Sequence, residues 1–396
     1  MMMMVLTTAL PEISEDLLIE ILIKLPAKSL MRLKRVSKIW LSLISCRYLA
    51  NRFLKPFPRQ RFLAYFRSSE RHALFRSSDH DHSDTLVSVI EKYMDIGTIG
   101  GGRLVGSVRG LLCFRSGRRV RVSNPMTRQV VELPVMEAGD ASNENLLFFF
   151  GHDPVNDEYK VLCTVWEVNN EEEKLVIRSE HQVLVLGAGA SWKKAECHIT
   201  HRPYRSCWLG VITINGVLYY TAWNDANECV VMSFNFSSQE FSLIELPVDA
   251  FIVWMNLTSR GIMNYKGKVS IFRALDFLSD GVLDVWVLED AGKSQWSDRK
   301  TFVLPDFQRM NTINGDLLKM RGSNRSGELW LSKTNPSFRK VRPSTKFIYD
   351  VERNKIAQRI VTIPLEDDDF AFPRTGWGVS VIVFSHDIES IMYLET

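Results

Sequence analysis

Hydrophobic residues follow two different patterns along the chain, one before residue 54 and one after residue 60. Near the N-terminus, Leu17, Ile21 and Leu25 recur at the four-residue interval of an amphipathic helix. Farther along, short runs rich in Val, Ile, Phe, Tyr and Trp alternate with Gly, Asn, Asp and Pro, which is typical of strands and turns. The pattern predicts a small helical segment followed by a β domain.

The N-terminal segment is predicted to form three short helices. Ser14 is suited to cap the first helix, and the acidic residues after it suit the positive first turn. Leu25-Pro26 ends that helix, because a residue before proline avoids the helical region. A second helix is expected around Leu30, and a third begins near Ser37 and carries Trp40.

These three helices carry more apolar surface than they can bury among themselves. A domain of this size buries only about 60% of the surface of its chain. Fully burying one Leu or Ile side chain contributes about 1.5–3 kcal/mol, so an apolar face left in water is a liability. Two interpretations follow: the helices pack on the rest of the chain, or they dock another protein.

The segment LPEISEDLLIEILIKLPAKSLMRLKRVSKIWLSLI resembles the F-box. The matching positions are Leu10-Pro11, the acidic helix start, Ile21-Leu22, Leu25-Pro26, Leu30, Arg32, Val36, Lys38 and Trp40. Ser37 stands where plant members usually carry Cys. The resemblance implies that residues 9–54 bind a Skp-type adaptor and, through it, a cullin-based ubiquitin ligase. The residues expected at the adaptor are Leu10, Pro11, Leu17, Ile21, Leu22, Leu25, Pro26, Leu30, Val36 and Trp40.

A repeat runs through the β-rich part of the chain. A Leu-Pro or Ile-Pro pair recurs at Pro134, Pro247, Pro305 and Pro364, with a period of about 57 residues if one copy near residues 191–196 has been lost. A four-stranded repeat of about this length is the signature of a propeller blade. Each unit is expected to open with a strand that follows a glycine, at Gly110, Gly216, Gly267 and Gly315.

The two ends of the β-rich part are expected to form one blade together. The strand at 61–66 would pair with the C-terminal strands at 379–395, and this closure would remove exposed sheet edges. The predicted fold is therefore mainly β: a short three-helix F-box followed, over residues 60–396, by a closed β-propeller-like domain of about six blades. Five and seven blades are the alternatives.

The first blades also resemble the F-box-associated interaction domain of plant F-box proteins, a group related to the kelch-repeat proteins. The residues that carry this resemblance are Gly110 to Cys113, Asn124-Pro125, Thr127-Arg128, Leu133-Pro134, Gly151, Asp153, Tyr159 to Val161 and Ser191-Trp192. Together with the F-box, the resemblance implies the substrate-recognition subunit of an SCF-type ubiquitin ligase.

Composition excludes several other classes of protein. The 396 residues carry a net charge of only +3, which is too mild to indicate binding to nucleic acid or to an acidic membrane. No apolar run reaches the roughly 18–20 residues of a membrane-spanning helix, and the first residues make a poor secretory signal. Six scattered cysteines favour a reducing compartment, the cytoplasm or the nucleus.

Candidate chemistry is sparse. Cys197, His198, His201 and Cys207 lie close together, but their spacing fits no standard zinc pattern, so we predict a loop between blades and no metal. No order of Ser, His and Asp and no paired carboxylates indicate catalysis. We therefore expect a non-catalytic receptor without a cofactor.

A protein substrate is expected to bind loops on one face of the propeller, because loops on a rigid scaffold usually carry specificity. The candidate loops are Glu137 to Asn145, Cys197 to Ser206 and Asp306 to Asn314. In the second, His201, Arg202, Tyr204 and Arg205 are the expected contact residues. The alternative function is a propeller that binds a carbohydrate or small ligand, with an F-box that controls only its own turnover.

Overall fold

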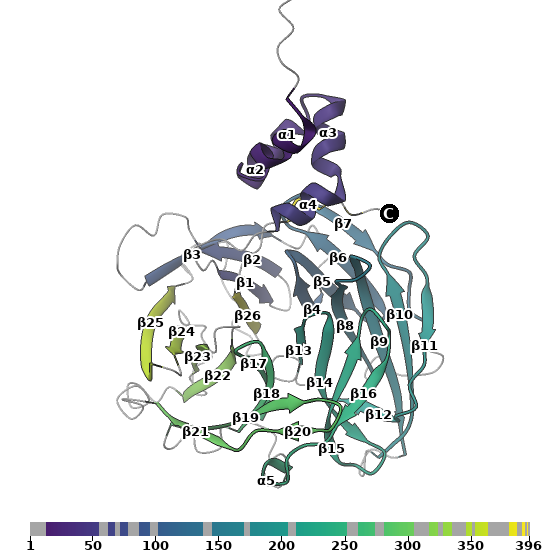
Figure 1. Cartoon of the computed structure of the whole chain (residues 1–396), viewed down its shortest axis with the longest axis vertical. Helices are drawn as coiled ribbons and strands as arrows, with labels where there is room; N and C mark the ends of the chain where they lie inside the picture. Colours follow the sequence, from purple (N-terminus) through teal and green to yellow (C-terminus); the bar gives the residue numbers. More distant parts are fainter. Residues whose placement is uncertain are drawn as a thin grey trace, which may run out of the picture.

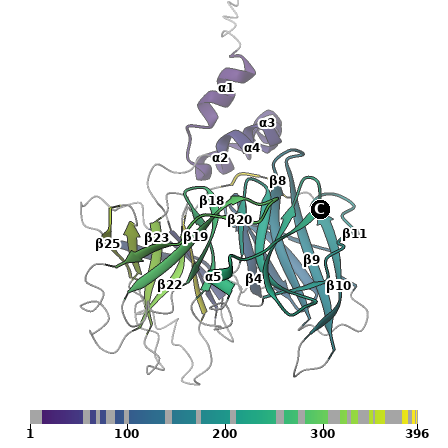
Figure 2. The ribbon, with the colours of Figure 1, turned by 60° about the horizontal axis from the view of Figure 1, so that its bottom comes forward.

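The computed structural model places a cluster of helices at the rim of a ring of β-sheets (Figures 1 and 2). It describes residues 13–54, 62–67, 72–77, 87–95, 102–137, 145–169, 175–204, 211–251, 260–273, 281–304, 317–323, 328–334, 346–350, 353–362, 380–385, 390–392 and 394.

Residues 13–54, the described part of the N-terminal segment, contain four helices: α1 (Glu15–Leu22), α2 (Ala27–Leu33), α3 (Lys38–Ser45) and α4 (Arg47–Phe53). The expected cap at Ser14 is confirmed, because the Ser14 hydroxyl accepts the Leu17 amide. The third helix does begin after Ser37, whose hydroxyl accepts the Trp40 amide. The prediction of three helices is wrong. The chain becomes extended at Cys46, whose Sγ accepts the Leu49 amide and so caps α4. Apolar residues continue across this break, so hydrophobic spacing did not reveal it.

Four sheets follow one another along the chain, and we call them blades one to four. Blade one comprises β4 (Arg103–Val108), β5 (Leu111–Ser116), β6 (Arg119–Asn124) and β7 (Gln129–Glu132). Blade two comprises β8 (Leu146–Asp153), β9 (Glu158–Val168), β10 (Val176–Val185) and β11 (Trp192–Ala195). Blade three comprises β12 (His201–Pro203), β13 (Val211–Ile214), β14 (Val217–Asn224), β15 (Cys229–Asn235) and β16 (Phe241–Ile244). The short helix α5 (Val248–Phe251) precedes blade four, which comprises β17 (Arg260–Tyr265), β18 (Lys268–Arg273), β19 (Val282–Asp290), β20 (Gln295–Trp296) and β21 (Lys300–Val303).

The remaining strands form one eight-stranded sheet that contains two blades. Blade five comprises β22 (Leu317–Ser323), β23 (Glu328–Thr334), β24 (Lys346–Asp350) and β25 (Lys355–Thr362). The closing blade comprises β1 (Phe62–Arg67), β2 (His72–Ser77), β3 (Val87–Asp95) and β26 (Ser380–Ser385). The parallel pairing of β25 with β3 joins the two sets, so the described strands group into six blades.

The closing blade takes its strands from both ends of the β-rich part of the chain. β26 pairs antiparallel with β1 from Phe62 opposite Ser385 to Arg67 opposite Ser380. The predicted closure is therefore confirmed for these strands. The last predicted strand is not one: Ser390 to Met392 have no strand structure and lie instead against blade one and the helices.

The glycines of the repeat lie in turns and do not open the blades. Each of the two-residue turns β4–β5, β13–β14 and β17–β18 has positive φ at both central residues, the pairs being Arg109-Gly110, Asn215-Gly216 and Lys266-Gly267. Such turns match the twist of the strands that they join, and glycine adopts their second position without strain. Blades one and four thus begin one strand earlier than the sequence indicated, and blade three begins two strands earlier. Gly315 lies outside the described residues.

Most of the propeller core lies between neighbouring blades. Along β8, Phe148 and Phe150 pack toward blade one, whereas Phe149 packs toward blade three. Strand β9 is almost continuously buried for the same reason, because both of its faces are covered. The apolar side chains on these strands therefore pack against neighbouring blades of the same chain.

A buried ion pair in blade two joins Asp153 and Lys160, two of the residues that carry the resemblance to the F-box-associated domain. Lys160 Nζ lies 2.7 Å from Asp153 Oδ2, and both side chains are almost completely buried. Lys160 also donates to the Phe236 carbonyl at 2.8 Å, and Ser237 donates to Asp153, so the pair ties blade two to blade three. Burial opposes the charge on Asp153, but hydrogen bonds from Lys160, Ser237 and Asn156 hold its pKa well below the usual range. A Cβ at nearby Gly151 would overlap the Phe236 ring.

Candidate functional site

The four helices bury one side of their apolar residues in a small core. Its innermost members include Leu22, Leu30, Ile44 and Leu49, each at most 2% exposed. Ile391, from the C-terminal segment, lies in the same core. The helices therefore do pack on the rest of the chain, as the first of the two interpretations expected, but through a limited part of their surface.

A second set of apolar side chains on these helices faces solvent. Leu17 and Ile21 are 59% and 51% exposed, and they lie one turn apart on the same face of α1. Val36, after α2, and Ile39, in α3, are 68% and 76% exposed. We call Leu17, Ile21, Val36 and Ile39 the exposed apolar set. Four large apolar side chains exposed within so short a segment make it a candidate docking surface.

The ten residues expected at the adaptor fall into three groups. Leu17, Ile21, Pro26 and Val36 are exposed, whereas Leu25 and Trp40 are half-buried at the edge of the helical core. Leu22 and Leu30 are buried and support the helices from within. Leu10 and Pro11 lie outside the described residues. Adaptor contact by these residues stays a prediction, and the two buried leucines fit an indirect, structural part in it.

Sequence reasoning did not select Ile39 or Leu41 for the surface, although both are exposed. The run IWLSLI in α3 is almost continuously apolar, so its spacing does not show which residues face the core. The signal that would have found Ile39 is the cap at Ser37: it sets the start of the helix and hence the direction of each later side chain.

Basic side chains accompany the exposed apolar set. Lys28, Arg32, Arg35 and Lys38 are exposed around α2 and the start of α3, and half-buried Lys34 has a pKa lowered by burial. Exposed Glu15 and Asp16 lie in the first turn of α1. The surface thus combines an apolar set with a basic region, which suits a partner that has apolar pockets and acidic side chains at their edge.

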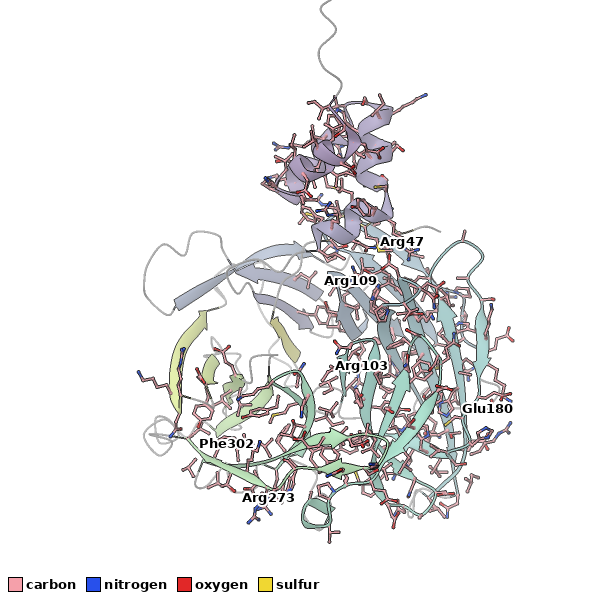
Figure 3. The ribbon with its side chains drawn as sticks, in the orientation of Figure 1. Arg47, Arg103, Arg109, Glu180, Arg273 and Phe302 are labelled. Carbon is pink, nitrogen blue, oxygen red and sulfur yellow. The ribbon has the colours of Figure 1, made fainter. Side chains whose placement is uncertain are left out.

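A polar joint connects α4 to the propeller, and Arg47 and Arg109 mark it in Figure 3. At its centre, the Asp157 carboxylate contacts Arg47 and Arg109, each at 3.1 Å, and also accepts a hydrogen bond from the Asn51 amide. Asn51 in turn accepts from Arg109 at 3.1 Å. Two residues of α4 and two from the first two blades are thus held in one network, which fixes the direction in which the helices leave the ring.

His152 adds a titratable group to this joint. Its Nε2 lies 2.8 Å from Asp157 Oδ1, and its ring lies beside Arg109. Burial lowers the pKa of His152, with the charge of Arg109 acting in the same direction, although the carboxylate of Asp157 opposes the shift. Burial likewise opposes the charge on Asp157, but hydrogen bonds from Asn51, His152 and Arg109 lower its pKa.

The C-terminal segment lies under the helices. Asn124 donates its side-chain amide to the carbonyls of Ser390 and Met392, at 3.0 and 2.8 Å. Ile391 and Met392 then pack into the helical core together with Met126 from blade one. The end of the chain therefore forms an apolar contact between helices and propeller beside the polar joint.

The residues expected at the substrate occupy different environments. His201 is fully buried, with Nε2 2.7 Å from the Tyr220 hydroxyl. Its direct contact with substrate stays a prediction, which this burial does not favour. Arg202 is half-buried above the Trp223 ring, and Tyr204 is half-buried. Strand pairing of β12 with β14 draws His201 inward, which the polar sequence around it did not indicate. Arg205 lies outside the described residues, as does most of each of the other two candidate loops.

Cysteine and histidine side chains meet at one place among the described residues, where His181, Cys197 and His201 come together. His198 is exposed and is not part of this group, and Cys207 lies outside the described part of the chain. No described helix is both long and apolar enough to cross a bilayer.

Comparisons with known proteins agree with this architecture. Residues 10–50 match the F-box domain, and residues 61–383 match the F-box associated beta propeller domain. F-box protein At3g52320 of Arabidopsis thaliana is 53% identical over 363 residues, which cover 90% of this chain and 88% of that protein. F-box/kelch-repeat protein At4g19930, from the same plant, is 34% identical over 412 residues, covering 97% of this chain and 91% of that protein.

Helices with a surplus apolar surface, mounted on a closed ring of blades, define an F-box protein with a propeller domain. The chain belongs to the family of F-box proteins that carry an F-box-associated β-propeller, and its relatives include F-box/kelch-repeat proteins. Both resemblances read from the sequence are thereby confirmed.

Proposed function

We propose that this protein is the substrate receptor of an SCF-type ubiquitin ligase, in the cytoplasm or the nucleus. Its helices would bind a Skp-type adaptor, and through it a cullin, while the propeller would hold the protein to be ubiquitinated. The observation that carries this proposal is the exposed apolar set, which remains uncovered although the rest of the helical segment has a complete core.

The receptor would act by proximity and would supply no catalytic group. Holding a target beside a charged ubiquitin-conjugating enzyme converts an encounter in solution into an intramolecular one, which raises the effective concentration of the target's lysines. The polar joint supports this role, because Arg47, Asn51 and Asp157 limit how far the helices swing relative to the propeller. A limited swing keeps the substrate at a constant distance from the ligase core.

The test of adaptor binding is a double variant, Leu17→Ala with Ile21→Ala. Each apolar anchor lost from an interface centre costs about 2 kcal/mol, so the double variant should bind a Skp-type adaptor about a thousandfold more weakly. Both side chains are exposed, so the thermal melting temperature should stay unchanged. The measurement is titration of purified adaptor by calorimetry, with melting followed in parallel.

The matched control also removes two exposed apolar side chains, Ile177→Ala in β10 and Val248→Ala in α5. Both lie on the propeller, so the adaptor affinity should not change. Equal affinity in the test and control variants, with both proteins folded, would contradict binding through α1.

Substrate capture is tested separately on the Cys197 to Ser206 segment. Replacing the whole segment would remove β12 and buried His201, so a fold defect would obscure the result. We therefore choose the single change Tyr204→Ala, which keeps the strand, and expect a smaller set of ubiquitinated proteins to co-purify after proteasome inhibition. Adaptor binding serves as the internal control, and an unchanged set of proteins would place substrate recognition elsewhere on the propeller.

A further inference from the structure

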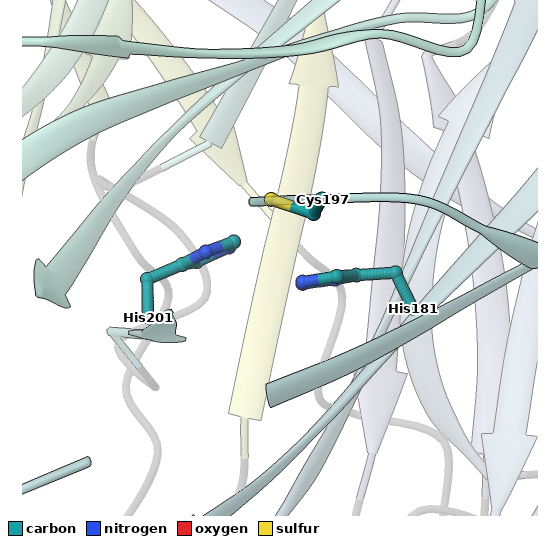
Figure 4. A group of neighbouring side chains, drawn as sticks. All are labelled: His181, Cys197 and His201. Atoms are coloured by element: carbon teal, nitrogen blue, oxygen red, sulfur yellow. The ribbon is translucent and has the colours of Figure 1, made fainter. Parts of the chain in front are cut away.

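Three metal-ligand side chains converge at the boundary between blades two and three (Figure 4). His181 comes from β10, His201 comes from β12, and Cys197 comes from the connection between these blades. Their ligand atoms all lie within 4.8 Å of one another. The two imidazole rings are stacked, with centroids 4.8 Å apart and an angle of 15° between the planes.

Both histidines are held by their Nδ1 atoms, which leaves Nε2 of His181 for a ligand, whereas Nε2 of His201 lies 2.7 Å from the Tyr220 hydroxyl. His181 Nδ1 lies 3.0 Å from the Thr164 hydroxyl, and His201 Nδ1 lies 2.8 Å from the Ile199 carbonyl. Histidines that bind metals usually use the other ring nitrogen in this way, because the second hydrogen bond fixes the tautomer and the ring direction. Strand pairing and a carbonyl of the connection thus orient both rings before any ion binds.

One atom of the cluster lacks a hydrogen bond although it is buried. His181 is 2% exposed, and its Nε2 has no hydrogen-bond partner in the described part of the chain. In Figure 4 the outer end of this ring points toward Cys197 and His201. A buried polar atom without a partner costs about 1–3 kcal/mol, so its presence needs a compensating interaction. A bound cation supplies one.

The protonation of the cluster also suits a cation. Burial lowers the pKa of His181 to about 3, with the charge of His201 adding to the effect, and burial lowers the pKa of His201 to about 4. Both rings are therefore neutral at physiological pH, and the geometry leaves Nε2 of His181 without a hydrogen-bond partner. Burial raises the pKa of the Cys197 thiol, so this group carries its proton until a metal displaces it.

We propose that His181, Cys197 and His201 bind one zinc ion between blades two and three. Imidazole nitrogen and thiolate sulfur are the ligands that zinc prefers, whereas calcium and magnesium require oxygen. When the ion binds, the Cys197 thiol releases its proton to solvent, and a lone pair of the resulting thiolate sulfur coordinates the ion. The ion would replace the contact between His201 Nε2 and the Tyr220 hydroxyl, which lie 2.7 Å apart, and a water molecule would complete the tetrahedral set.

The movement of the ligand side chains that zinc binding requires is small. Zinc–nitrogen and zinc–sulfur bonds of about 2.0–2.3 Å place ligand atoms roughly 3.3–3.7 Å apart in a tetrahedron. The cluster must therefore contract by about 1 Å from its present limit of 4.8 Å, and rotation of the half-buried Cys197 side chain supplies most of this change. The Phe241 ring, 4.5 Å from the His181 ring, covers the cluster and helps to exclude water.

The ion would join two blades that are otherwise connected here by a short irregular segment. It would also hold the backbone that leads from Cys197 to Tyr204, and hence the segment proposed to contact substrate. A cation at this place is thus a structural clamp for the propeller and is independent of adaptor binding by the helices, so its failure would leave the receptor proposal intact.

The experiment uses the full chain, stripped with a chelator and then titrated with zinc chloride. We expect about one zinc per chain by mass spectrometry of metals, together with a rise in melting temperature. Cys197→Ser should reduce zinc affinity at least a hundredfold and abolish the rise. The matched control is Cys229→Ser, which alters a buried cysteine of blade three outside the cluster and should retain both effects.

Cobalt titration gives a second readout that does not depend on stability. Cobalt bound by a thiolate develops a sulfur-to-metal charge-transfer band, which should be present in the unmodified chain and in Cys229→Ser but absent in Cys197→Ser. Zinc uptake that is equal in all three proteins, or no uptake at micromolar free zinc, would overturn the proposal. Preferential binding of copper(I) over zinc at Cys197 would overturn the assignment to zinc.

Discussion

The helical segment and the propeller differ in how completely they bury their apolar side chains. In the propeller, successive residues of a strand such as β8 pack toward different neighbouring blades, so apolar side chains of both faces are covered. In the helical segment, one set of apolar side chains forms a core while Leu17, Ile21, Val36 and Ile39 stay in solvent. Similar hydrophobicity thus closes the fold in one region and leaves apolar side chains exposed in the other.

The two regions also differ in how they depend on the ends of the chain. The propeller needs β26 to pair with β1, whereas the helices obtain most of their core from contiguous residues. The difference predicts that the propeller fails as a whole when one end is lost, and that the helices respond locally.

The largest expected effect follows removal of residues 380–396. The deletion takes away β26 and the segment that reaches the helical core, so β1 loses its partner along six residue pairs. We expect the cooperative melting transition of the propeller to disappear and the protein to aggregate, because an unpaired strand edge is exposed. Circular dichroism measures the melting transition, and light scattering measures the aggregation.

Its counterpart is removal of residues 1–54, which takes away the helices and leaves the ring closed. That protein should remain folded and melt cooperatively at a somewhat lower temperature, because it loses the joint at Asp157 and exposes Ile391. A deletion of 380–396 that melts as well as this control would contradict closure by the chain ends.

A smaller loss of stability is expected at acidic pH, and it should mainly affect the propeller. Folded His181 and His201 have pKa values of about 3 and 4, below the ordinary 6.5. Between pH 6.5 and these values the unfolded chain binds protons that the folded chain does not. The free energy of unfolding is therefore highest above pH 6.5 and falls as the pH decreases toward 4.

The comparison variant is His181→Phe, which keeps an aromatic ring in the stack but removes one titrating group. Measured with a chelator present, its melting temperature should fall less steeply between pH 6.5 and 4 than that of the unmodified protein. Identical slopes would show that other groups control the acid response.

The smallest expected effect concerns the joint between the two regions. Asp157→Ala removes the carboxylate that contacts Arg47, Asn51 and Arg109, at a cost of about 1 kcal/mol, because these groups are partly exposed. Melting and adaptor affinity should change little. The distance distribution between spin labels on α1 and α5 should become broader, as double electron–electron resonance measures.

The matched control for the joint is Glu289→Ala, which breaks an exposed ion pair with Lys268 on blade four, away from the helices. It should leave the distance distribution unchanged. A distribution that stays narrow in Asp157→Ala would show that the apolar contact of Ile391 is enough to orient the helices.

Much of the architecture was predictable from the sequence because local physics decides it. The cap at Ser14, the proline after Leu25 and the period of the Leu-Pro pairs all act over a few residues or repeat along the chain. The fourth helix was missed because Cys46 interrupts the helix without interrupting the apolar pattern. The extra strand before each glycine was missed because a two-residue turn marks a hairpin but not which strand begins the blade.

The sites were less predictable because they join residues that are distant in the sequence. His181 meets Cys197 and His201 only because two blades pack side by side, so no motif spacing includes all three. Asp157 meets Arg47 in the same way, through packing of a helix on a turn of blade two. Conversely, the polar residues around His201 indicated an exposed loop, but the pairing of β12 with β14 buries the imidazole ring.

The pairing of β1 with β26 also sets an order of events during synthesis. Strand β1 leaves the ribosome early, but its partner is made only near residue 385, so the ring closes after almost the whole chain has been translated. Contacts so distant in sequence form slowly, whereas the short helices fold from neighbouring residues. We expect a nascent chain to bind adaptor before it can hold substrate, which adaptor pull-down of ribosome-stalled chains would measure. A product of premature termination would then occupy the adaptor without delivering a target and would interfere with its own full-length form.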